Sequence, residues 1–490
     1  MATFYLPATL RALVAGGADQ LDAAGATVGE ALRQLERQHP RLAGWVLDER
    51  GGLRRHVSLF VNDSPAAPES PLAPGDQVHI VPAISGGAPA AAAPQGTAGP
   101  SPSPAPPAVA AAAADLVEVL AGTRKGLFVL RGPRGGRLAI VARRFAGQPV
   151  EYAMRDPRSG RCFAAVTHGH FGPHLFFSAD PAAPEDRWEQ AAGPTFPPDA
   201  GATLERIWVV EPGSEDGALW AGVAPAALFR SGDGGRSWEL VRGLWEEPSR
   251  PRWQPGFGGL CLHSICPWPG EPAKLAVGIS SAGVWVTEDG GGSWRRGTDG
   301  LVARYLPEEA RAANISFCIH KLLRAERQPA TLYMQFHGGV YRSDDAGLTW
   351  NDIGTGRGLP SDFGFPLALD PRDPARAFVI PLVADADRVT PEGRLRVYET
   401  LDRGASWHPL AAGLPQEDCY LTILRQAFSH DGGDPLGLYF GAESGDLFAS
   451  GDGGRSWSAA IAGLPPILSV RAHRRDGQAP EGKAPGPALG

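Results

Sequence analysis

A short motif that ends in tryptophan recurs through the C-terminal part of the chain. Its pattern is Ser/Thr-x-Asp-x-Gly-x-Ser/Thr-Trp, and successive copies place their aspartates 56, 56, 57 and 50 residues apart. Self-similarity at this period predicts a propeller or a related array of sheets, because a single repeat cannot bury its own apolar face. The five full copies contain Asp233, Asp289, Asp345, Asp402 and Asp452.

A sixth and a seventh unit complete the array. A degenerate copy, Ser178-Ala-Asp180 with Trp188, precedes the five full motifs. The seventh unit is split: residues 117–130 predict two middle strands, 137–142 an outer strand, and 466–471 the innermost strand. Joining the two chain ends within one blade leaves no open sheet edge. We therefore expect an all-β propeller of seven blades, with six as the alternative if the hairpin at 117–130 is only an addition.

The first 87 residues have a different pattern. Residues 3–13 read as a strand that runs into a turn at Gly16-Gly17. Apolar residues between 27 and 39 fall at helical spacing, with Thr27 as N-cap and Glu30 as its capping-box partner. Residues 56–62 predict a strand, and 72–82 a turn and a last strand. The order strand, strand, helix, strand, strand predicts an α+β domain of the β-grasp type.

The diglycine Gly86-Gly87 closes this domain but not the chain. An Ala/Pro-rich segment at 88–115 follows and predicts an extended, semi-rigid linker. The propeller is expected over 116–475, and the Gly/Pro/Ala-rich residues 476–490 predict a disordered tail. The carboxyl group of Gly87 forms a peptide bond with Ala88, so either the chain is cut there or the diglycine is chemically silent.

Three segments of the N-terminal domain carry a signature: Phe60-Val-Asn62, Gly75-Asp76-x-Val78-x-Ile80 and Pro82-Ala-Ile-Ser-Gly-Gly87. Over the whole of 1–87 they resemble the MoaD/ThiS family of ubiquitin-like sulfur carriers. The resemblance implies that a ThiF/MoeB-like enzyme uses ATP in trans to activate Gly87, which becomes a thiocarboxylate. The sulfur then passes to an acceptor protein, for molybdopterin, thiazole or tRNA synthesis, and no bound cofactor is expected. The alternative is a docking domain with a relic tail.

The repeated octads resemble the Asp boxes, or BNR repeats, of sialidase- and sortilin-like propellers. This resemblance implies a structural role for the five aspartates, since their side chains can bond backbone N–H groups in hairpin turns. Sialidases also need three arginines on the substrate carboxylate, a Tyr–Glu pair and an acidic Asp. The nearest string to their Arg-Ile-Pro signature is Arg206-Ile207-Trp208, and the inner strands carry no clear arginine triad. A sialidase is therefore not expected.

Counting back from each Asp box locates the start of each inner strand and predicts one ring of side chains at one mouth of the channel. Such a ring is the default binding site of a propeller, although a mouth can also be polar simply because it is wet. The insertions at 244–259 and 298–316 should rim the same face, with Trp245, Trp253 and Phe257 as candidate lids. The ring comprises Glu151, Tyr152, Glu205, Arg206, His263, His320, Asp362, Tyr420 and Arg471.

Three functions follow from these features. The first is a sulfur-carrier or docking domain tethered to a propeller that binds an unknown ligand. The second is a propeller hydrolase of the glycosidase type, or a lyase, with the β-grasp as an accessory; Glu151 and Glu205 would be its carboxylates. The third is a non-catalytic interaction scaffold.

Two sets of residues are weak candidates for metal ligands. Cys261-Leu-His263 and Cys318-Ile-His320 occupy equivalent positions in adjacent blades, and residues i and i+2 of a strand share a face. Small buried cysteines in inner strands explain this pattern more simply, so no metal is expected. The second set is His168, His170 and His174.

Charge and cysteine usage restrict the partners and the compartment. A net charge of -7 does not suit nucleic-acid binding. No apolar run is long enough to cross a bilayer, and the N-terminus lacks the charged and apolar regions of a signal peptide. The five cysteines are odd in number and form no CxxC motif, which is typical of a reduced, cytoplasmic protein.

Overall fold

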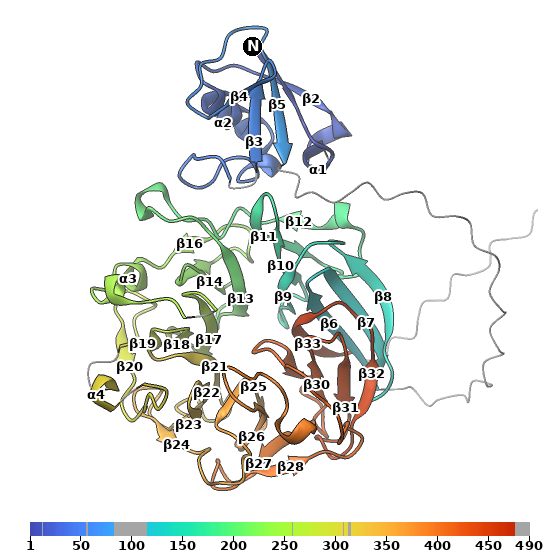
Figure 1. The fold of residues 1–490 in the computed structure, drawn as a ribbon, viewed down its shortest axis with the longest axis vertical. Helices are drawn as coiled ribbons and strands as arrows, with labels where there is room; N and C mark the ends of the chain where they lie inside the picture. The colour runs from blue at the N-terminus through green and yellow to red at the C-terminus, as the bar shows by residue number, and fades with distance from the viewer. Residues whose placement is uncertain are drawn as a thin grey trace, which may run out of the picture. The chain divides into compact units, whose positions relative to one another are not determined.

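The computed structural model describes residues 1–11, 13–54, 57–82, 115–256, 258–306, 308–311 and 315–475. The chain divides into two compact units (Figure 1). The first includes residues 1–82, and the second is Leu116–Arg475. Within the described residues, none of the helices has the length and apolar character that a membrane span requires.

The N-terminal unit is a five-stranded mixed sheet with one long helix. Its sheet order is β2-β1-β5-β3-β4, and β1 runs parallel to β5. This arrangement confirms the predicted β-grasp. The elements are β1 (Ala2–Tyr5), α1 (Ala8–Arg11), β2 (Gln20–Ala23), α2 (Val28–Gln38), β3 (Val57–Val61), β4 (Ser64–Ala66) and β5 (Gln77–Pro82).

Local chemistry sets the ends of these elements. The Thr27 hydroxyl accepts a hydrogen bond from the Glu30 N–H at 3.3 Å, while the Glu30 carboxylate accepts one from the Ala26 N–H at 2.8 Å. The helix therefore starts where the capping box predicted. The predicted strand over 3–13 is too long: β1 ends at Tyr5, and Pro7, which has no N–H to donate, leads into α1.

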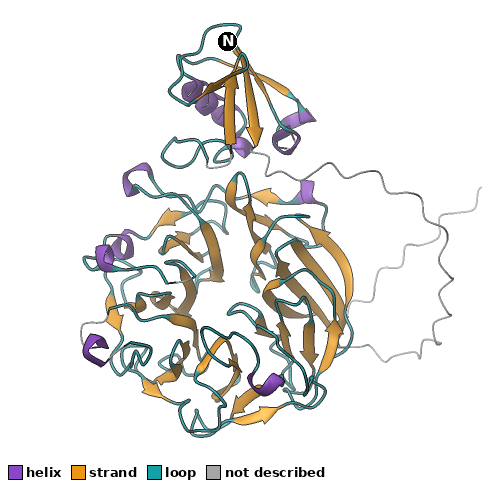
Figure 2. Cartoon of the chain, in the orientation of Figure 1, coloured by secondary structure: helices purple, strands orange, loops and turns teal. Residues whose placement is uncertain are grey.

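The second unit consists of seven four-stranded antiparallel sheets (Figure 2). Neighbouring sheets pack through buried apolar side chains such as Phe229, Tyr333 and Phe378. Two short helices, α3 (Arg242–Trp245) and α4 (Glu308–Arg311), lie in the connections between sheets. Six sheets follow one another along the chain, each given from its inner to its outer strand: β9 (Val150–Arg155), β10 (Cys162–His168), β11 (Gly172–Ser178), β12 (Glu189–Gln190); β13 (Arg206–Pro212), β14 (Leu219–Ala224), β15 (Ala227–Ser231), β16 (Glu239–Leu240); β17 (Leu262–Trp268), β18 (Glu271–Ile279), β19 (Gly283–Thr287), β20 (Arg295–Gly297); β21 (Ile319–Arg324), β22 (Leu332–Phe336), β23 (Gly339–Ser343), β24 (Asn351–Asp352); β25 (Phe363–Asp370), β26 (Asp373–Leu382), β27 (Val397–Thr400), β28 (His408–Leu410); β29 (Phe428–His430), β30 (Leu438–Gly441), β31 (Leu447–Ser450), β32 (Ser458–Ile461).

The seventh sheet is built from both ends of the unit. Its order is β33-β6-β7-β8, and the register runs from Ile467 opposite Thr123 to Arg475 opposite Leu116. In Figure 1 the red strand β33 accordingly lies beside the teal strand β6. The split blade is confirmed, and the six-bladed alternative is wrong. The strands are β33 (Ile467–Arg475), β6 (Leu116–Thr123), β7 (Gly126–Pro133) and β8 (Ala139–Arg144).

Each full Asp box follows the third strand of a blade and closes a tight turn on itself. In the first box, Asp233 accepts hydrogen bonds from the Ser237 N–H and hydroxyl, and Ser231 accepts one from the Gly235 N–H at 2.9 Å. Partial burial raises the pKa of Asp233, but the hydrogen bonds from Ser237 outweigh it and hold this pKa at about 2. The aspartate is thus a turn-forming group with its lone pairs occupied, as the resemblance implied.

Candidate functional site

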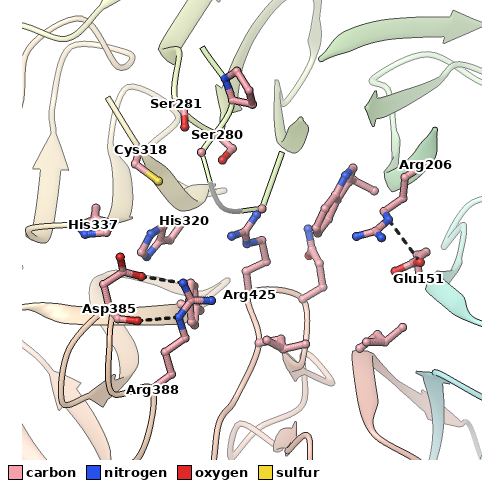
Figure 3. Close-up of a pocket in the computed structure, with 18 of the residues that line it drawn as sticks. Glu151, Arg206, Ser280, Ser281, Cys318, His320, His337, Asp385, Arg388 and Arg425 are labelled. Carbon is pink, nitrogen blue, oxygen red and sulfur yellow. Dashed lines mark hydrogen bonds and ion pairs between the residues drawn. The ribbon is translucent and has the colours of Figure 1, made fainter. Parts of the chain in front are cut away.

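A cavity of about 820 Å³ opens at the end of the propeller channel where the inner strands begin (Figure 3). Its walls come from the first residues of the inner strands and from the loops that precede them or join the second and third strands. Residues 254–256 and 258 line it, as do Tyr305 and Ser316, so the two insertions do rim this face. The Asp boxes close hairpins at the opposite end, because strands alternate in direction from the inner strand outward.

The structure brings three of the predicted ring residues together in this cavity: Glu151, Arg206 and His320. Glu151 and Arg206 form an ion pair at 3.4 Å, drawn in Figure 3. Burial raises the pKa of Glu151, and the positive charge of Arg206 opposes that shift. These three of the predicted ring residues therefore line one cavity, and their role in binding stays a prediction.

The other ring residues lie elsewhere. Tyr152 and Arg471 lie deeper in the channel and line a second cavity, and His263 is fully buried in the wall. None of the remaining three lines the large cavity: Glu205, Asp362 and Tyr420. Since Glu205 is exposed one residue before β13 begins, it does not face Glu151 across the cavity. The two-carboxylate arrangement suggested for a hydrolase is therefore not formed by this pair.

The proposed tryptophan lids are also wrong. Trp253 is buried and packs against Trp285 with ring centroids 5.4 Å apart. Trp245 lies under the Arg250 guanidinium, 3.7 Å from the ring centroid. Both indoles belong to the apolar wall rather than to the cavity. The third candidate, Phe257, lies outside the described residues.

Sequence analysis missed the basic character of the cavity. Besides Arg206, it is lined by Arg124, Arg388 and Arg425. Arg124 follows β6, and the other two lie in the loops before β27 and β29. Loop residues carry no periodic signal, so the search along inner strands did not find them.

Arg425 differs from the other three arginines in its partners. Arg124 pairs with Glu443 at 3.2 Å, Arg206 with Glu151, and Arg388 with Asp385 at 2.7 Å. Within the described chain, no carboxylate forms an ion pair with Arg425. Its guanidinium lies 5.3 Å from the ring centroid of Trp208 and donates a weak bond to the Cys261 sulfur at 3.9 Å. Arg425 therefore brings a positive charge into the cavity without an internal counter-ion.

In the structure, the candidate metal ligands form a different group from the one that the sequence suggested. Cys318 and His320 gather with His337 rather than with Cys261 and His263, and one ligand atom from each of the three lies within 4.8 Å of the others. His263 is excluded by its own hydrogen bonds: Nδ1 pairs with the Ser264 hydroxyl at 3.0 Å and Nε2 with the Ile319 carbonyl at 2.8 Å. Of the four weak candidates, Cys318 and His320 belong to this group, whereas Cys261 and His263 do not.

The second histidine candidate does not form a ligand set. The His168 Nδ1 accepts hydrogen bonds from the backbone N–H groups of His170 and Phe171. The His174 Nε2 donates to the Phe171 carbonyl at 3.1 Å. Two of the three rings are thus bound to the backbone of their own hairpin. Burial lowers the pKa of His168 to about 4.

A polar network separates the large cavity from a second one of about 640 Å³ at the opposite end of the channel. Gln426 lines the large cavity, and its Oε1 accepts hydrogen bonds from Lys321 Nζ at 2.6 Å and from Arg471 at 3.1 Å. Arg471 also donates to the Tyr152 hydroxyl, which donates to the Glu211 carboxylate at 2.7 Å. These five residues form the channel network.

The proposed carrier residues, Gly86 and Gly87, lie outside the described residues. The last described residue before them is Pro82, at which β5 ends. Gly87 therefore follows the final strand of the β-grasp by five positions in the sequence.

Comparisons with known proteins match each unit separately. The ThiS family model matches residues 4–87. Small archaeal modifier protein 1 from Haloferax volcanii is 39% identical over 62 residues, which are 13% of this chain and 71% of that protein. The protein is also similar to a chain in a solved BexX/CysO complex from Amycolatopsis orientalis, with 31% sequence identity and a TM-score of 0.17. The match covers 18% of this protein and the whole of that chain.

The propeller has a more distant relative. A xyloglucanase from Hypocrea jecorina is 28% identical over 160 residues, or 31% of this chain. The match spans only 18% of the length of that enzyme.

Proposed function

Because the chain belongs, through its N-terminal domain, to the ThiS family, we propose that this domain is a sulfur carrier tethered to a ligand-binding propeller. The observation that carries the proposal is the diglycine Gly86-Gly87, which ends five residues beyond the last strand of a ThiS-type β-grasp. Glycines lack Cβ atoms and form a narrow tail that can enter the active site of another enzyme.

The chemistry requires a free carboxylate on Gly87. Hydrolysis of the Gly87–Ala88 bond first supplies that carboxylate. One of its oxygens then attacks the α-phosphate of ATP and displaces pyrophosphate on an adenylating enzyme of the ThiF/MoeB type. A hydrosulfide-equivalent sulfur next displaces AMP and leaves the thiocarboxylate, which an acceptor protein consumes. The adenylation step uses ATP and the following step uses reduced sulfur, so the proposal also assigns the protein to the cytoplasm.

The propeller is the binding half of this proposal. Its large cavity offers the Arg425 guanidinium without an internal counter-ion, between the aromatic walls of Trp208 and Phe365. A cation in a concave, partly apolar site favours a ligand with an acidic group and a flat or apolar body. The tether keeps carrier and propeller in one molecule until the chain is cut.

The intact mass of the protein purified from its own host tests the carrier role. We expect a fragment that ends at Gly87, with one oxygen replaced by sulfur when sulfur-containing cofactors are being made. Gly87→Ala should abolish the thiocarboxylate, because adenylating enzymes of this family act on a terminal diglycine. Gly96→Ala, the same change within the linker segment, is the matched control.

Two results would contradict the carrier role. One is a single uncut chain under conditions that demand cofactor synthesis. The other is unchanged thiocarboxylate formation in the Gly87→Ala variant.

A further inference from the structure

We propose that Cys318, His320 and His337 bind a zinc ion at the wall of the large cavity, with the fourth coordination position open to the cavity. This inference concerns the propeller alone and stands or falls independently of the carrier role. The three side chains line the cavity and lie next to one another in Figure 3. We call them the CHH cluster.

Backbone pairing fixes the three positions. Cys318 directly precedes β21, and His320 is the second residue of that strand, at a break in its register between Ile319 and Lys321. Both side chains line the cavity. His337 follows the neighbouring strand β22, and its N–H donates to the Cys318 carbonyl at 3.1 Å. The cluster thus belongs to the first two strands of one blade, which hold its backbone rigidly.

The ring of His320 is oriented in the way that protein metal ligands usually are. Its Nδ1 lies 2.6 Å from the Gly364 carbonyl oxygen, and since a carbonyl can only accept, this nitrogen carries the proton. The lone pair is therefore on Nε2, which has no hydrogen-bond partner among the residues described. Metal-bound histidines typically donate their second N–H to a backbone carbonyl in this manner.

His337 supplies the second imidazole. Its ring packs against three other rings: Tyr305 at 4.6 Å, and Phe363 and His320 at centroid distances of 5.2 and 5.3 Å. These T-shaped contacts position the ring while leaving its nitrogens for another partner.

The chemical types of the three ligand atoms indicate which metal ion the cluster would bind. One thiolate and two imidazoles suit Zn²⁺, which takes three protein ligands plus a solvent molecule in its open sites. Ligand atoms in a tetrahedral zinc site are about 3.3–3.7 Å apart, given the usual Zn–N and Zn–S bond lengths. The three atoms already lie within 4.8 Å of one another, so small side-chain rotations close the site. On binding, the Cys318 thiol loses its proton to solvent and the sulfur donates its electron pair to the metal.

The fourth position faces the same space as Arg425. A zinc ion with one thiolate ligand keeps a net positive charge, and Arg425 adds another on the same side. The exogenous ligand would therefore be water or a carboxylate group, held between the metal and the guanidinium.

Cobalt substitution tests the site on the full-length protein. After removal of metals with a chelator, the protein should bind one equivalent of Co²⁺ and develop the thiolate-to-cobalt charge-transfer band and the visible bands of a tetrahedral centre. Zinc should displace the cobalt and bleach both. Cys318→Ser should abolish the charge-transfer band, and His337→Ala should weaken binding at least about tenfold.

Cys261→Ser is the matched control, because Cys261 is a neighbouring buried thiol outside the cluster. It should leave the spectrum and the affinity unchanged. The proposal is overturned if the wild-type protein shows no charge-transfer band, or if the band persists in Cys318→Ser. It is also overturned if Cys261→Ser loses the band while Cys318→Ser, checked for folding by circular dichroism, keeps it.

Discussion

An arginine at one end of the propeller channel is paired with polar side chains, whereas an arginine at the other end has no carboxylate partner among the described residues. At the end with the second cavity, Arg471 donates to the Tyr152 hydroxyl and to Gln426, and lies 3.8 Å from Glu211. At the end with the large cavity, Arg425 has aromatic neighbours and one weak bond to sulfur. Both guanidiniums are partly enclosed in the same channel, about one blade apart along the chain.

This contrast separates a structural group from a binding group. A buried polar network whose members are all paired stabilises one conformation and leaves nothing for a ligand to satisfy. An enclosed charge without an internal partner costs free energy unless a ligand or water completes it. The channel network is therefore assigned to structure, and Arg425 with the CHH cluster to binding.

The largest expected effect comes from Arg471→Ala. The substitution leaves the Tyr152 hydroxyl without its donor and the Glu211 carboxylate without its nearby cation, so the free energy of unfolding should fall by about 2–4 kcal/mol. Denaturant unfolding measures this loss. Arg455→Ala, at an exposed position in an Asp-box turn, is the control and should change stability by less than about 0.5 kcal/mol. An Arg471 variant as stable as the control would remove the basis for calling the network structural.

A second, smaller effect should appear as a dependence of stability on pH. Burial lowers the pKa of Lys321 to about 7 from an ordinary value of 10.5. Between these values the unfolded chain binds a proton that the folded chain does not, so the free energy of unfolding should rise with pH. One proton corresponds to about 1.4 kcal/mol per pH unit.

Lys321→Met keeps the length of the side chain and removes the titrating amine. Comparing unfolding free energies at pH 7.5 and pH 9, roughly the middle of this window, should show the slope reduced in this variant. Lys125→Met, at an exposed lysine, should leave the slope as it is in the wild type. Equal slopes in all three proteins would mean that Lys321 is protonated in the folded state, and the network would then contain an additional charge.

The sequence predicted the fold of the propeller better than the residues of its candidate site. Seven blades and the split seventh sheet followed from the Asp-box period and from the need to leave no sheet edge open. Glu151, Arg206 and His320 were found because inner strands start at a regular distance from the boxes. Tyr152 lines the second cavity instead of the large one, and Glu205 is exposed just before β13 begins.

Counting back from the Asp boxes could not identify the loop residues that line the cavity. Arg388 and Arg425 lie in connections of unequal length, where no period relates one blade to the next. His337 joins Cys318 only because two strands of the same blade are paired, which a search for equivalent positions in adjacent blades does not consider. Cys261 and His263 had the right spacing, but the His263 ring is already bound to Ser264 and Ile319.

The smallest expected effect on stability, and the sharpest test of the contrast, is Arg425→Ala. Because Arg425 has no ion pair to lose, its removal should change the free energy of unfolding by less than about 0.5 kcal/mol. The same change should abolish the binding of small carboxylates, with citrate as the probe in calorimetry, whereas Arg455→Ala should bind citrate as the wild type does. If Arg425→Ala destabilises the propeller as strongly as Arg471→Ala, the two ends of the channel do not differ in kind. Arg425 would then be a structural residue whose stabilising partner is the aromatic wall of Trp208 and Phe365.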